Sequence, residues 1–272
     1  MLTTILPLLR CPLCGGRFEK KENSLVCGQR HTFDIARQGS VNFIPQQKES
    51  FYKKELFEAR AEVFEAGVYA PVIDVLSQAI NCYVEKENPV LLDAGCGEGY
   101  YTKSICRDRT MTRIGFDLAK EAVKLAAKGP KTAFFCAADL KNIPLRDHSV
   151  DILLDIFTPA NYAEFARVLT PGGLVFKLAP RAGYLKELRQ AAAHLLRRGE
   201  YDGGQVESYV KEKMNLVEQT AITYTLPVKK EIVESLARMT PMLAGVDVDA
   251  LDLSGITEIT IDETLYIGSV KE

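Results

Sequence analysis

Long hydrophobic runs are missing from this 272-residue sequence. No apolar stretch approaches the ~18–20 residues that a membrane-spanning helix needs. The opening MLTTILPLLR has neither a basic leading region nor a small-residue cleavage site, which argues against a secretory signal peptide. We therefore expect no membrane partner and a cytoplasmic location.

A strong excess of charge is missing as well. The formal net charge is −2, which argues against a generally basic nucleic-acid-binding protein. The charge is unevenly distributed, because residues 1–60 contain ten Lys or Arg and six Asp or Glu. This positive N-terminal region is a weak indication of a polyanionic partner. A solvated protein surface explains the same count equally well.

Low-complexity tracts and internal repeats are also absent, and the composition, with 47% hydrophobic and 26% charged residues, is that of an ordinary folded protein. Turn-forming residues and cysteines dominate residues 1–45, and a helical pattern follows over residues 51–87. From residue 89 onward, short apolar runs alternate with helical stretches. The candidate strands of this region are VLLDAG, TRIGFDL, TAFFCAAD, DILLDIF and LVFKLAP.

Near-continuous apolar strands separated by helices are typical of a parallel sheet covered on both faces, so we predict an α/β fold. The last part of the chain differs. AITYTLPV and TEITIDETLYIGSV alternate like strands and flank the helical KKEIVESLARM. These two late strands predict an additional sheet edge that can include an antiparallel member.

A glycine-rich loop follows the first of the predicted strands, in LLDAGCGEGYY. Gly95, Gly97 and Gly99 allow a sharp turn and a close approach of the backbone to a ligand at the next helix N-terminus. Asp93 stands two residues before the first glycine, where a carboxylate opposes a pyrophosphate but suits a positively charged amino-acid group. This arrangement argues against a nicotinamide cofactor.

Two further acids end the next two predicted strands. Asp117, in IGFDL, is placed to bind a ribose diol, and Asp139, in AADLKNIP, is placed to meet an adenine amino group. A ribose, an adenine and a cationic amino-acid part without phosphate together describe S-adenosylmethionine. Taken singly, each acid is equally well an ordinary strand-end or capping residue.

Metal-binding spacing marks the stretch from Cys11 to His31. Cys11 and Cys14 form C-x2-C, and Cys27 and His31 follow as a second short pair. Zinc takes four nitrogen or sulfur ligands in a tetrahedron, and two such pairs can supply them. Because the set contains no carboxylate and no evident open position, we predict a structural Zn²⁺ site that contributes the folding energy of a module of about 40 residues.

The segments DAGCGEG, GFD, AADLKNIP and RVLTPGG resemble class I S-adenosylmethionine-dependent methyltransferases over residues 89–272. This resemblance implies a Rossmann-like, mostly parallel sheet of seven strands with the last strand reversed. The order of zinc module, helical connector and methyltransferase resembles the ribosomal RNA large-subunit guanine-N1 methyltransferases, which act on a hairpin loop of 23S rRNA domain II. The segments that carry this second resemblance are CPLC, CGQRHTFDIARQGSVNFIP, EARAEVFEAGVYAP, LLDAGCGEGYYT and Met239-Thr240-Pro241.

The family resemblance implies roles for individual residues and regions. It implies Zn²⁺ ligation by the Cys11–His31 set, and cofactor contacts from Tyr69, Gly97, Glu98 and Tyr184. It divides the chain into a zinc-binding RNA-recognition module (residues 1–45), a helical connector (46–88) and a methyltransferase domain (89–272). It also implies a homodimer.

Transfer of a methyl group to guanine N1 requires removal of the N1 proton. The segment DILLDIFTPANY places Asp155 at the carboxyl end of the fourth strand, and we predict it as the base. An extruded guanine would be held by aromatic and Arg side chains. The candidates are Phe18, Phe33, Arg17, Arg30 and Arg37 of the zinc module, with Tyr100 and Tyr101 beside the glycine loop.

Three other functions stay open at this point. The chain has Tyr184 where the family has His, so methylation of another RNA base is one alternative. A small-molecule methyltransferase is a second, and it predicts unchanged turnover after deletion of residues 1–45. A non-catalytic zinc-bearing interaction protein is a third, and it predicts no binding of the cofactor.

Overall fold

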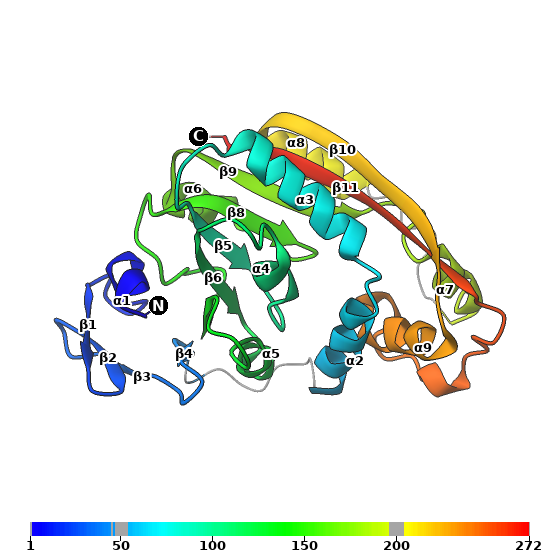
Figure 1. Ribbon diagram of the computed structural model, residues 1–272, viewed down its shortest axis with the longest axis horizontal. Helices are drawn as coiled ribbons and strands as arrows, with labels where there is room; N and C mark the ends of the chain where they lie inside the picture. Colours follow the sequence, from blue (N-terminus) through cyan, green and yellow to red (C-terminus); the bar gives the residue numbers. More distant parts are fainter. Residues whose placement is uncertain (1, 45, 47–53, 196–203, 272) are drawn as a thin grey trace.

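The hydrophobic strands of the sequence form the centre of the molecule. The structure, a computed structural model, describes residues 2–44, 46, 54–195 and 204–271, so residues 47–53 of the predicted connector lie outside it. Within the described residues, one eight-stranded sheet has the order β10-β11-β9-β8-β5-β6-β7-β4 (Figure 1). Its strands are β4 (Val41–Asn42), β5 (Val90–Ala94), β6 (Thr112–Asp117), β7 (Phe134–Ala137), β8 (Val150–Ile156), β9 (Leu169–Pro180), β10 (Met214–Pro227) and β11 (Glu258–Val270).

The pairing within this sheet confirms the predicted Rossmann-like arrangement. Strands β5 to β9 pair in parallel, and the last strand, β11, runs antiparallel between β9 and β10. Parallel strands buried on both faces need apolar side chains on both faces, and every residue of β8 is buried. The sheet has one strand more than the predicted seven, because β4 from the N-terminal segment pairs in parallel with β7.

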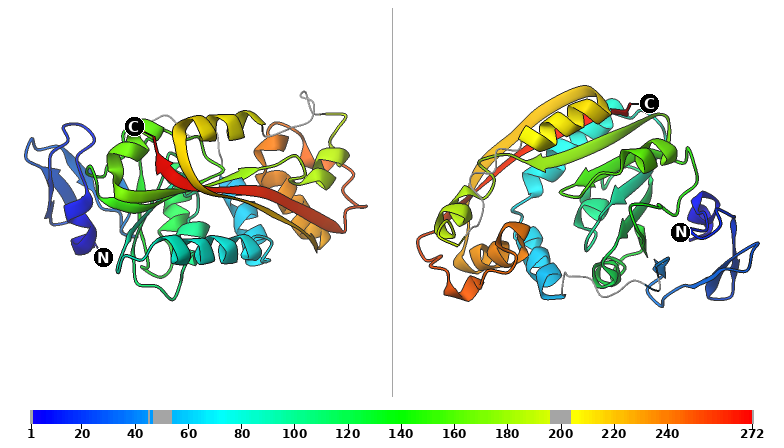
Figure 2. Two further views of the ribbon diagram at one scale, coloured as in Figure 1. Left: turned by 90° about the horizontal axis from the view of Figure 1, so that it is seen from above. Right: turned by 180° about the vertical axis from the view of Figure 1, so that it is seen from behind.

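Helices cover both faces of the sheet (Figure 2). Helix α3 (Ala70–Tyr83) packs on one face through Val72, Leu76 and Ile80, with α4 (Tyr100–Ser104) beside it. Helices α6 (Tyr162–Val168) and α8 (Gly204–Lys213) cover the other face. Further helical segments after β6 are α5 (Lys120–Ala126), α7 (Lys186–Ala191), α9 (Lys230–Met239), η2 (Pro241–Leu243) and η3 (Val248–Ala250).

Helix α2 (Lys54–Glu65) leads into α3 and packs against α9 at the end of the molecule opposite the N-terminus (Figure 1). The hydroxyl of Ser235 on α9 donates a hydrogen bond of 2.6 Å to Glu62 on α2. Among the described residues, no single helix has the length and apolarity to span a membrane, although α2 and α3, bent by 78°, pass that test as a pair.

The N-terminal segment forms a small sheet of its own. Helix α1 (Leu2–Ile5) and η1 (Leu6–Leu8) precede the antiparallel strands β1 (Phe18–Lys21), β2 (Ser24–Cys27) and β3 (Thr32–Asp34). Phe18, Phe33 and Phe43 are buried and in ring contact, with centroids 5.1–5.7 Å apart. Of the predicted base-stacking residues, Phe18 and Phe33 therefore form the core of this module and are not available to stack on RNA.

Candidate functional site

The loop after β5 contains three glycines, two of which closely approach neighbouring segments. Gly95, Gly97 and Gly99 have φ values of +75°, +56° and +80°, a region that L-amino acids with a side chain rarely adopt. A Cβ atom on Gly95 would lie 2.5 Å from Thr158 Oγ1, and one on Gly99 would lie 2.7 Å from Phe135 Cζ. Gly95 and Gly99 are therefore required by the backbone conformation and by the space around them, and Gly97 by the backbone conformation alone.

The first two predicted acids lie on either side of this loop. Asp93 is buried and accepts a hydrogen bond of 2.6 Å from the hydroxyl of Thr102, and burial raises the pKa of Asp93 to about 7. The Asp117 carboxylate accepts hydrogen bonds from the backbone N–H groups of Gly97, at 2.9 Å, and Ala119, at 2.7 Å. Asp117 therefore fixes the glycine loop, and each of its oxygens retains a second lone pair for a ligand.

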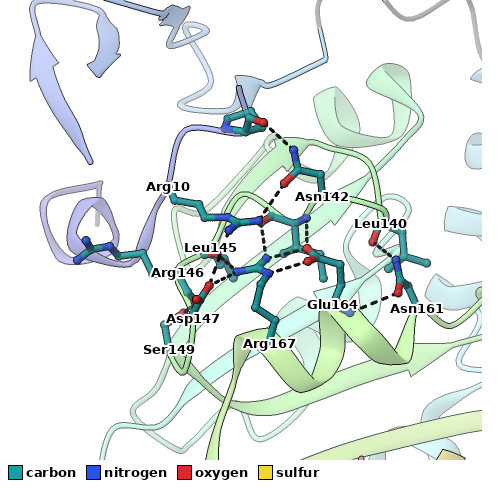
Figure 3. Close-up of polar contacts among 12 residues, drawn as sticks. Arg10, Leu140, Asn142, Leu145, Arg146, Asp147, Ser149, Asn161, Glu164 and Arg167 are labelled. Atoms are coloured by element: carbon teal, nitrogen blue, oxygen red, sulfur yellow. Dashed lines mark hydrogen bonds and ion pairs between the residues drawn. The ribbon is translucent and has the colours of Figure 1, made fainter. Parts of the chain in front are cut away.

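The third acid, Asp139, directly precedes a loop that is held from several sides, from Leu140 onward in Figure 3. Its carboxylate accepts from the backbone N–H of Lys141 at 2.9 Å. Further along, the amide of Asn142 donates to the Pro12 carbonyl at 2.7 Å and accepts from Arg10 at 3.0 Å. Asn161 donates to the Leu140 carbonyl at 3.1 Å. The predicted adenine loop is thus bonded directly to the N-terminal segment.

Arg167 on α6 is the centre of the same network (Figure 3). Its guanidinium donates to the carbonyls of Ile143, at 2.9 Å, and Leu145, at 2.8 Å, and forms ion pairs with Glu164 and Asp147. A planar group with five N–H donors can bond all of these partners at once. Arg167 therefore fixes the second half of the loop that starts at Asp139.

Glu98, the predicted cofactor residue within the glycine loop, forms an ion pair with Arg60 of α2, and Arg60 Nε lies 2.9 Å from Glu98 Oε2. The Arg60 guanidinium also lies over the ring of Phe64, 5.1 Å from its centroid. Glu98 is thus engaged with the connector helix. The sequence reasoning missed Arg60, which is one of many charged residues on a polar helix.

The two predicted tyrosines meet although they are 115 positions apart in the sequence. The hydroxyls of Tyr69 and Tyr184 are 2.5 Å apart, and burial raises the pKa of both phenols. The Glu263 carboxyl lies behind them, fully buried, and neither of its oxygens has a hydrogen-bond partner among the described residues. It interacts electrostatically with both tyrosines. Glu263 was also missed, because one acid within an alternating strand looks like a surface residue.

A cleft of about 1500 Å³ opens where β8 and β9 end. Its wall includes the tyrosine pair, Arg60, the segment Phe157-Thr158-Pro159 and Lys177. Met239, Thr240 and Pro241, which belong to the family resemblance, also line this cleft. The cleft adjoins the glycine loop through the contact between Thr158 and Gly95. It is therefore lined by the connector helix and the late helical region and lies next to the predicted cofactor loop.

Asp155, the predicted base, has no exposed surface. Lys177 Nζ donates to Asp155 Oδ2 at 2.7 Å and to the Thr158 carbonyl at 3.3 Å. Burial raises the pKa of Asp155, and the Lys177 ammonium opposes that rise. In this arrangement Asp155 holds a lysine that itself borders the cleft.

The predicted metal ligands converge in the N-terminal module. The ligand atoms of Cys11, Cys14, Cys27 and His31 all lie within 4.8 Å of one another. Cys11 Sγ is 3.5 Å and Cys27 Sγ is 3.4 Å from His31 Nδ1, and Cys14 Sγ is 3.6 Å from Cys27 Sγ. A zinc tetrahedron with bonds of ~2.0–2.3 Å has edges of roughly 3.5–3.8 Å. Three thiols and one imidazole at these distances fit Zn²⁺.

Comparisons with known proteins cover both parts of the chain. The family model described as RlmA, N-terminal, a zinc ribbon, matches residues 9–51, and a methyltransferase-domain model matches residues 92–176. YxjB of Bacillus subtilis, provisionally named a 23S rRNA (guanine-N1)-methyltransferase, is 32% identical over 98% of each chain. The chain belongs to the 23S rRNA (guanine-N1)-methyltransferase family.

Further comparisons extend this family assignment. The 23S rRNA (guanine(748)-N1)-methyltransferase of Streptomyces fradiae is 29% identical, again over 98% of each chain. A chain in the complex between the Haloferax volcanii Trm112 methyltransferase activator and a methyltransferase has a TM-score of 0.50 and 17% identity, and covers 81% of this chain and all of that one. This likeness concerns the fold. Within the guanine-N1 methyltransferase family, the methyltransferase domain indicates S-adenosylmethionine as cofactor, and the zinc ribbon with its Cys/His cluster indicates zinc.

Proposed function

We propose that this protein transfers the methyl group of S-adenosylmethionine to N1 of a guanine in a hairpin loop of 23S rRNA. The observation that carries the proposal is the 1500 Å³ cleft, which adjoins the glycine loop at the carboxyl ends of the parallel strands. Ligands of open α/β sheets bind at this edge. Relatives matched over nearly the whole chain are named for methylation of 23S rRNA guanine N1.

The cofactor-binding residues that we propose surround the glycine loop. Gly95, Gly97 and Gly99 form a loop of positive φ at the end of β5, Asp93 is the residue two positions before it, and Asp117 accepts from the Gly97 N–H at the end of β6. We propose that these residues, with Asp139 at the adenine, and with Tyr69, Glu98 and Tyr184, hold the cofactor. When bound, the cofactor supplies an electrophilic methyl group. The protein's task is to place the guanine in line with that group and to exclude water.

Removal of the N1 proton is the other chemical requirement. Asp155 stays a prediction for this role, and its burial and ion pair with Lys177 support a second role as a positioning residue. Replacement of Asp155 by Asn distinguishes the two. Loss of a base removes the acidic limb of the pH–rate profile, whereas loss of positioning lowers the rate equally at every pH.

We propose that residues 1–45 recognise the RNA, residues 46–88 connect the two parts, and residues 89–272 carry out the transfer. Arg17, Arg30 and Arg37 of the zinc module supply positive charge for the phosphates. We further propose a homodimer that acts in the cytoplasm. Light scattering tests the dimer separately from activity.

The function is tested by transfer of labelled methyl groups to ribosomal RNA that lacks this modification, followed by mass spectrometry of the nucleosides. The expected product is 1-methylguanosine in 23S rRNA. A different methylated base would assign the protein to another RNA target. Efficient transfer to a small molecule, unchanged when Arg17, Arg30 and Arg37 are replaced by Ala, would support the small-molecule alternative.

A further inference from the structure

We propose that Phe157 is the aromatic platform on which the target guanine stacks during methyl transfer. This inference rests on the proposed function and assigns a residue to the part of it that holds the base. Phe157 follows β8 directly and lines the cleft. Its side chain is exposed by 38%, although large aromatic side chains are normally buried.

The residue whose ring lines the cleft also has an unusual backbone conformation. Its φ is +54°, in the left-handed region, which residues with a side chain rarely adopt. Such strain persists only where the surroundings enforce it, and it is concentrated at functional sites. Leu185 has a similar φ of +50° but is fully buried, whereas the Phe157 ring combines this conformation with exposure to the cleft.

Three contacts hold the strained segment in place. The Phe157 N–H donates to the Leu178 carbonyl of β9 at 3.2 Å. Lys177, anchored by Asp155, donates to the carbonyl of Thr158, the next residue. Thr158 in turn lies against the backbone of Gly95. The same contacts therefore link the position of the Phe157 ring to the glycine loop of the cofactor.

The ring has a neighbour on one side. The centroids of Phe157 and Tyr184 are 5.4 Å apart with an interplanar angle of 38°, and the Tyr184 hydroxyl is bonded to Tyr69. Tyr184 is thereby fixed and supports the Phe157 ring from one side, while the ring's exposed surface belongs to the cleft. A flat ring, rigidly supported at the strand end next to the cofactor loop, fits a purine base.

An extruded guanine loses its stacking on neighbouring bases and must recover it in the protein. Stacking of a base on an aromatic side chain contributes ~1–3 kcal/mol, which corresponds to roughly a 5- to 150-fold effect on kcat/KM at 25 °C. We therefore expect the Phe157→Leu variant, which keeps an apolar side chain but removes the ring, to lose about 10- to 100-fold in kcat/KM for 23S rRNA. The Phe157→Tyr variant should stay within about threefold of the wild type, because it retains the ring.

The absence of tryptophan from the chain provides a direct probe of stacking. In the Phe157→Trp variant, residue 157 is the sole tryptophan. We expect its fluorescence to be quenched when a synthetic RNA hairpin containing the target guanine binds in the presence of S-adenosylhomocysteine. A hairpin with an abasic site at that position should restore most of the emission. The matched control is Val217→Trp, at a side chain on β10 that is exposed by 56% and does not line the cleft.

Two results would overturn the inference. One is equal quenching of the Phe157→Trp variant by the guanine and abasic hairpins, or by S-adenosylhomocysteine alone, which would place the ring against the cofactor. The other is unchanged kcat/KM in Phe157→Leu. Failure of the proposed function has a different signature, since the wild-type protein would then methylate no 23S rRNA guanine at all. Calorimetric titration with S-adenosylhomocysteine should give the same affinity for Phe157→Leu and wild type, which shows that the variant is folded.

Discussion

At Gly99, two separate physical restrictions act on one residue. Its φ is +80°, and an added Cβ would lie 2.7 Å from the Phe135 ring. Gly129 has a similar φ of +82° but nothing within 4 Å of the same position. Substitution of Gly129 therefore tests the cost of the backbone conformation alone, whereas substitution of Gly99 adds the cost of the close approach to Phe135.

We expect Gly129→Ala to lower the free energy of unfolding by about 1–2 kcal/mol, the strain of a left-handed residue with a side chain. Gly99→Ala should cost about 2–5 kcal/mol, because overpacking against Phe135 adds about 1–3 kcal/mol. It should also weaken binding of S-adenosylhomocysteine. Urea unfolding and calorimetric titration of both variants measure these effects. Equal destabilisation by the two substitutions would show that Phe135 yields without cost.

Glu263 is a second residue with an unusual environment. It lies on β11 within the apolar cluster that underlies α3, and the groups facing it are the phenols of Tyr69, Tyr101, Tyr184 and Tyr224. Burial, and the neighbouring Asp262, raise the pKa of Glu263 well above its usual value of 4.5. The folded protein therefore holds this proton to a higher pH than the unfolded chain does.

The sign of the resulting pH effect follows from proton linkage. The contribution of Glu263 to stability is fully present below about pH 4.5 and is lost as the pH rises through the folded-state pKa. Glu263→Gln removes this dependence, so it should raise the Tm at pH 8 by at least about 2 °C, equivalent to ~1 kcal/mol. At pH 4 the difference should be small. Glu258→Gln, at an exposed position of the same strand, is the control, and a Tm difference that does not change with pH would contradict the assignment.

At the scale of elements, the pattern of apolar residues in the sequence predicted the strands that are buried in the centre of the sheet. The five candidate parallel strands coincide with β5 to β9, because strands buried on both faces must be continuously apolar. Strand β4 was not predicted, because a strand of two residues is too short to show alternation of apolar and polar residues. Helix α8 was missed for a related reason: Val210 is its only buried residue, so its sequence shows no apolar stripe. Strand β10 begins at Met214, earlier than the predicted AITYTLPV, because the exposed half of an edge strand is largely polar.

Within the site, the acids and glycines at strand ends could be predicted because topology brings the carboxyl ends of parallel strands together. The side chains from other elements that pair with these residues could not be predicted. The contacts of Arg60 with Glu98 and of Lys177 with Asp155 depend on tertiary packing that sequence spacing does not encode. The backbone conformation of Phe157 also has no local sequence signal, since a non-glycine residue at positive φ is set by its surroundings.

The loop that begins at Asp139 depends on Arg167 for its shape. We expect Arg167→Ala to raise the Kd for S-adenosylhomocysteine about 5- to 30-fold, equivalent to ~1–2 kcal/mol, because the carbonyls of Ile143 and Leu145 lose their donor. Isothermal titration calorimetry measures the change. Arg146→Ala is the control, since the hydrogen bonds of Arg146 to Leu8 and Ser149 are made by its backbone. An unchanged affinity in Arg167→Ala would show that the loop keeps its shape without this residue.

At the scale of the whole molecule, zinc and the sheet stabilise different parts. The module holding the Cys/His cluster has three phenylalanines in mutual contact, which join the apolar cluster on one face of the large sheet, and the other face of the sheet has a large apolar cluster of its own. Metal binding supplies most of the folding free energy of such small modules. Removal of zinc by a chelator should therefore unfold β1 to β3 and leave β5 to β9 folded.

Hydrogen exchange read by mass spectrometry tests this expectation. Peptides covering residues 18–34 should lose protection in the chelated protein, while those covering β8 keep it. The Cys27→Ser variant should behave like the chelated wild type. Unchanged protection of residues 18–34 after verified metal loss would show that the three-phenylalanine core is sufficient.

Strand β4 has a practical consequence for any shortened form of this protein. Val41 and Asn42 pair with Cys136 and Ala137, and the Phe43 N–H donates to the Ala137 carbonyl at 2.9 Å. A protein that lacks residues 1–45 loses these bonds. The backbone groups of β7 that paired with β4 are then left unpaired at an open edge of the sheet. Open edges of this kind pair with other chains. Aggregation of the truncated protein would then lower its turnover without any change in the catalytic site, so arginine substitutions in the intact chain give the clearer measure of what the zinc module contributes.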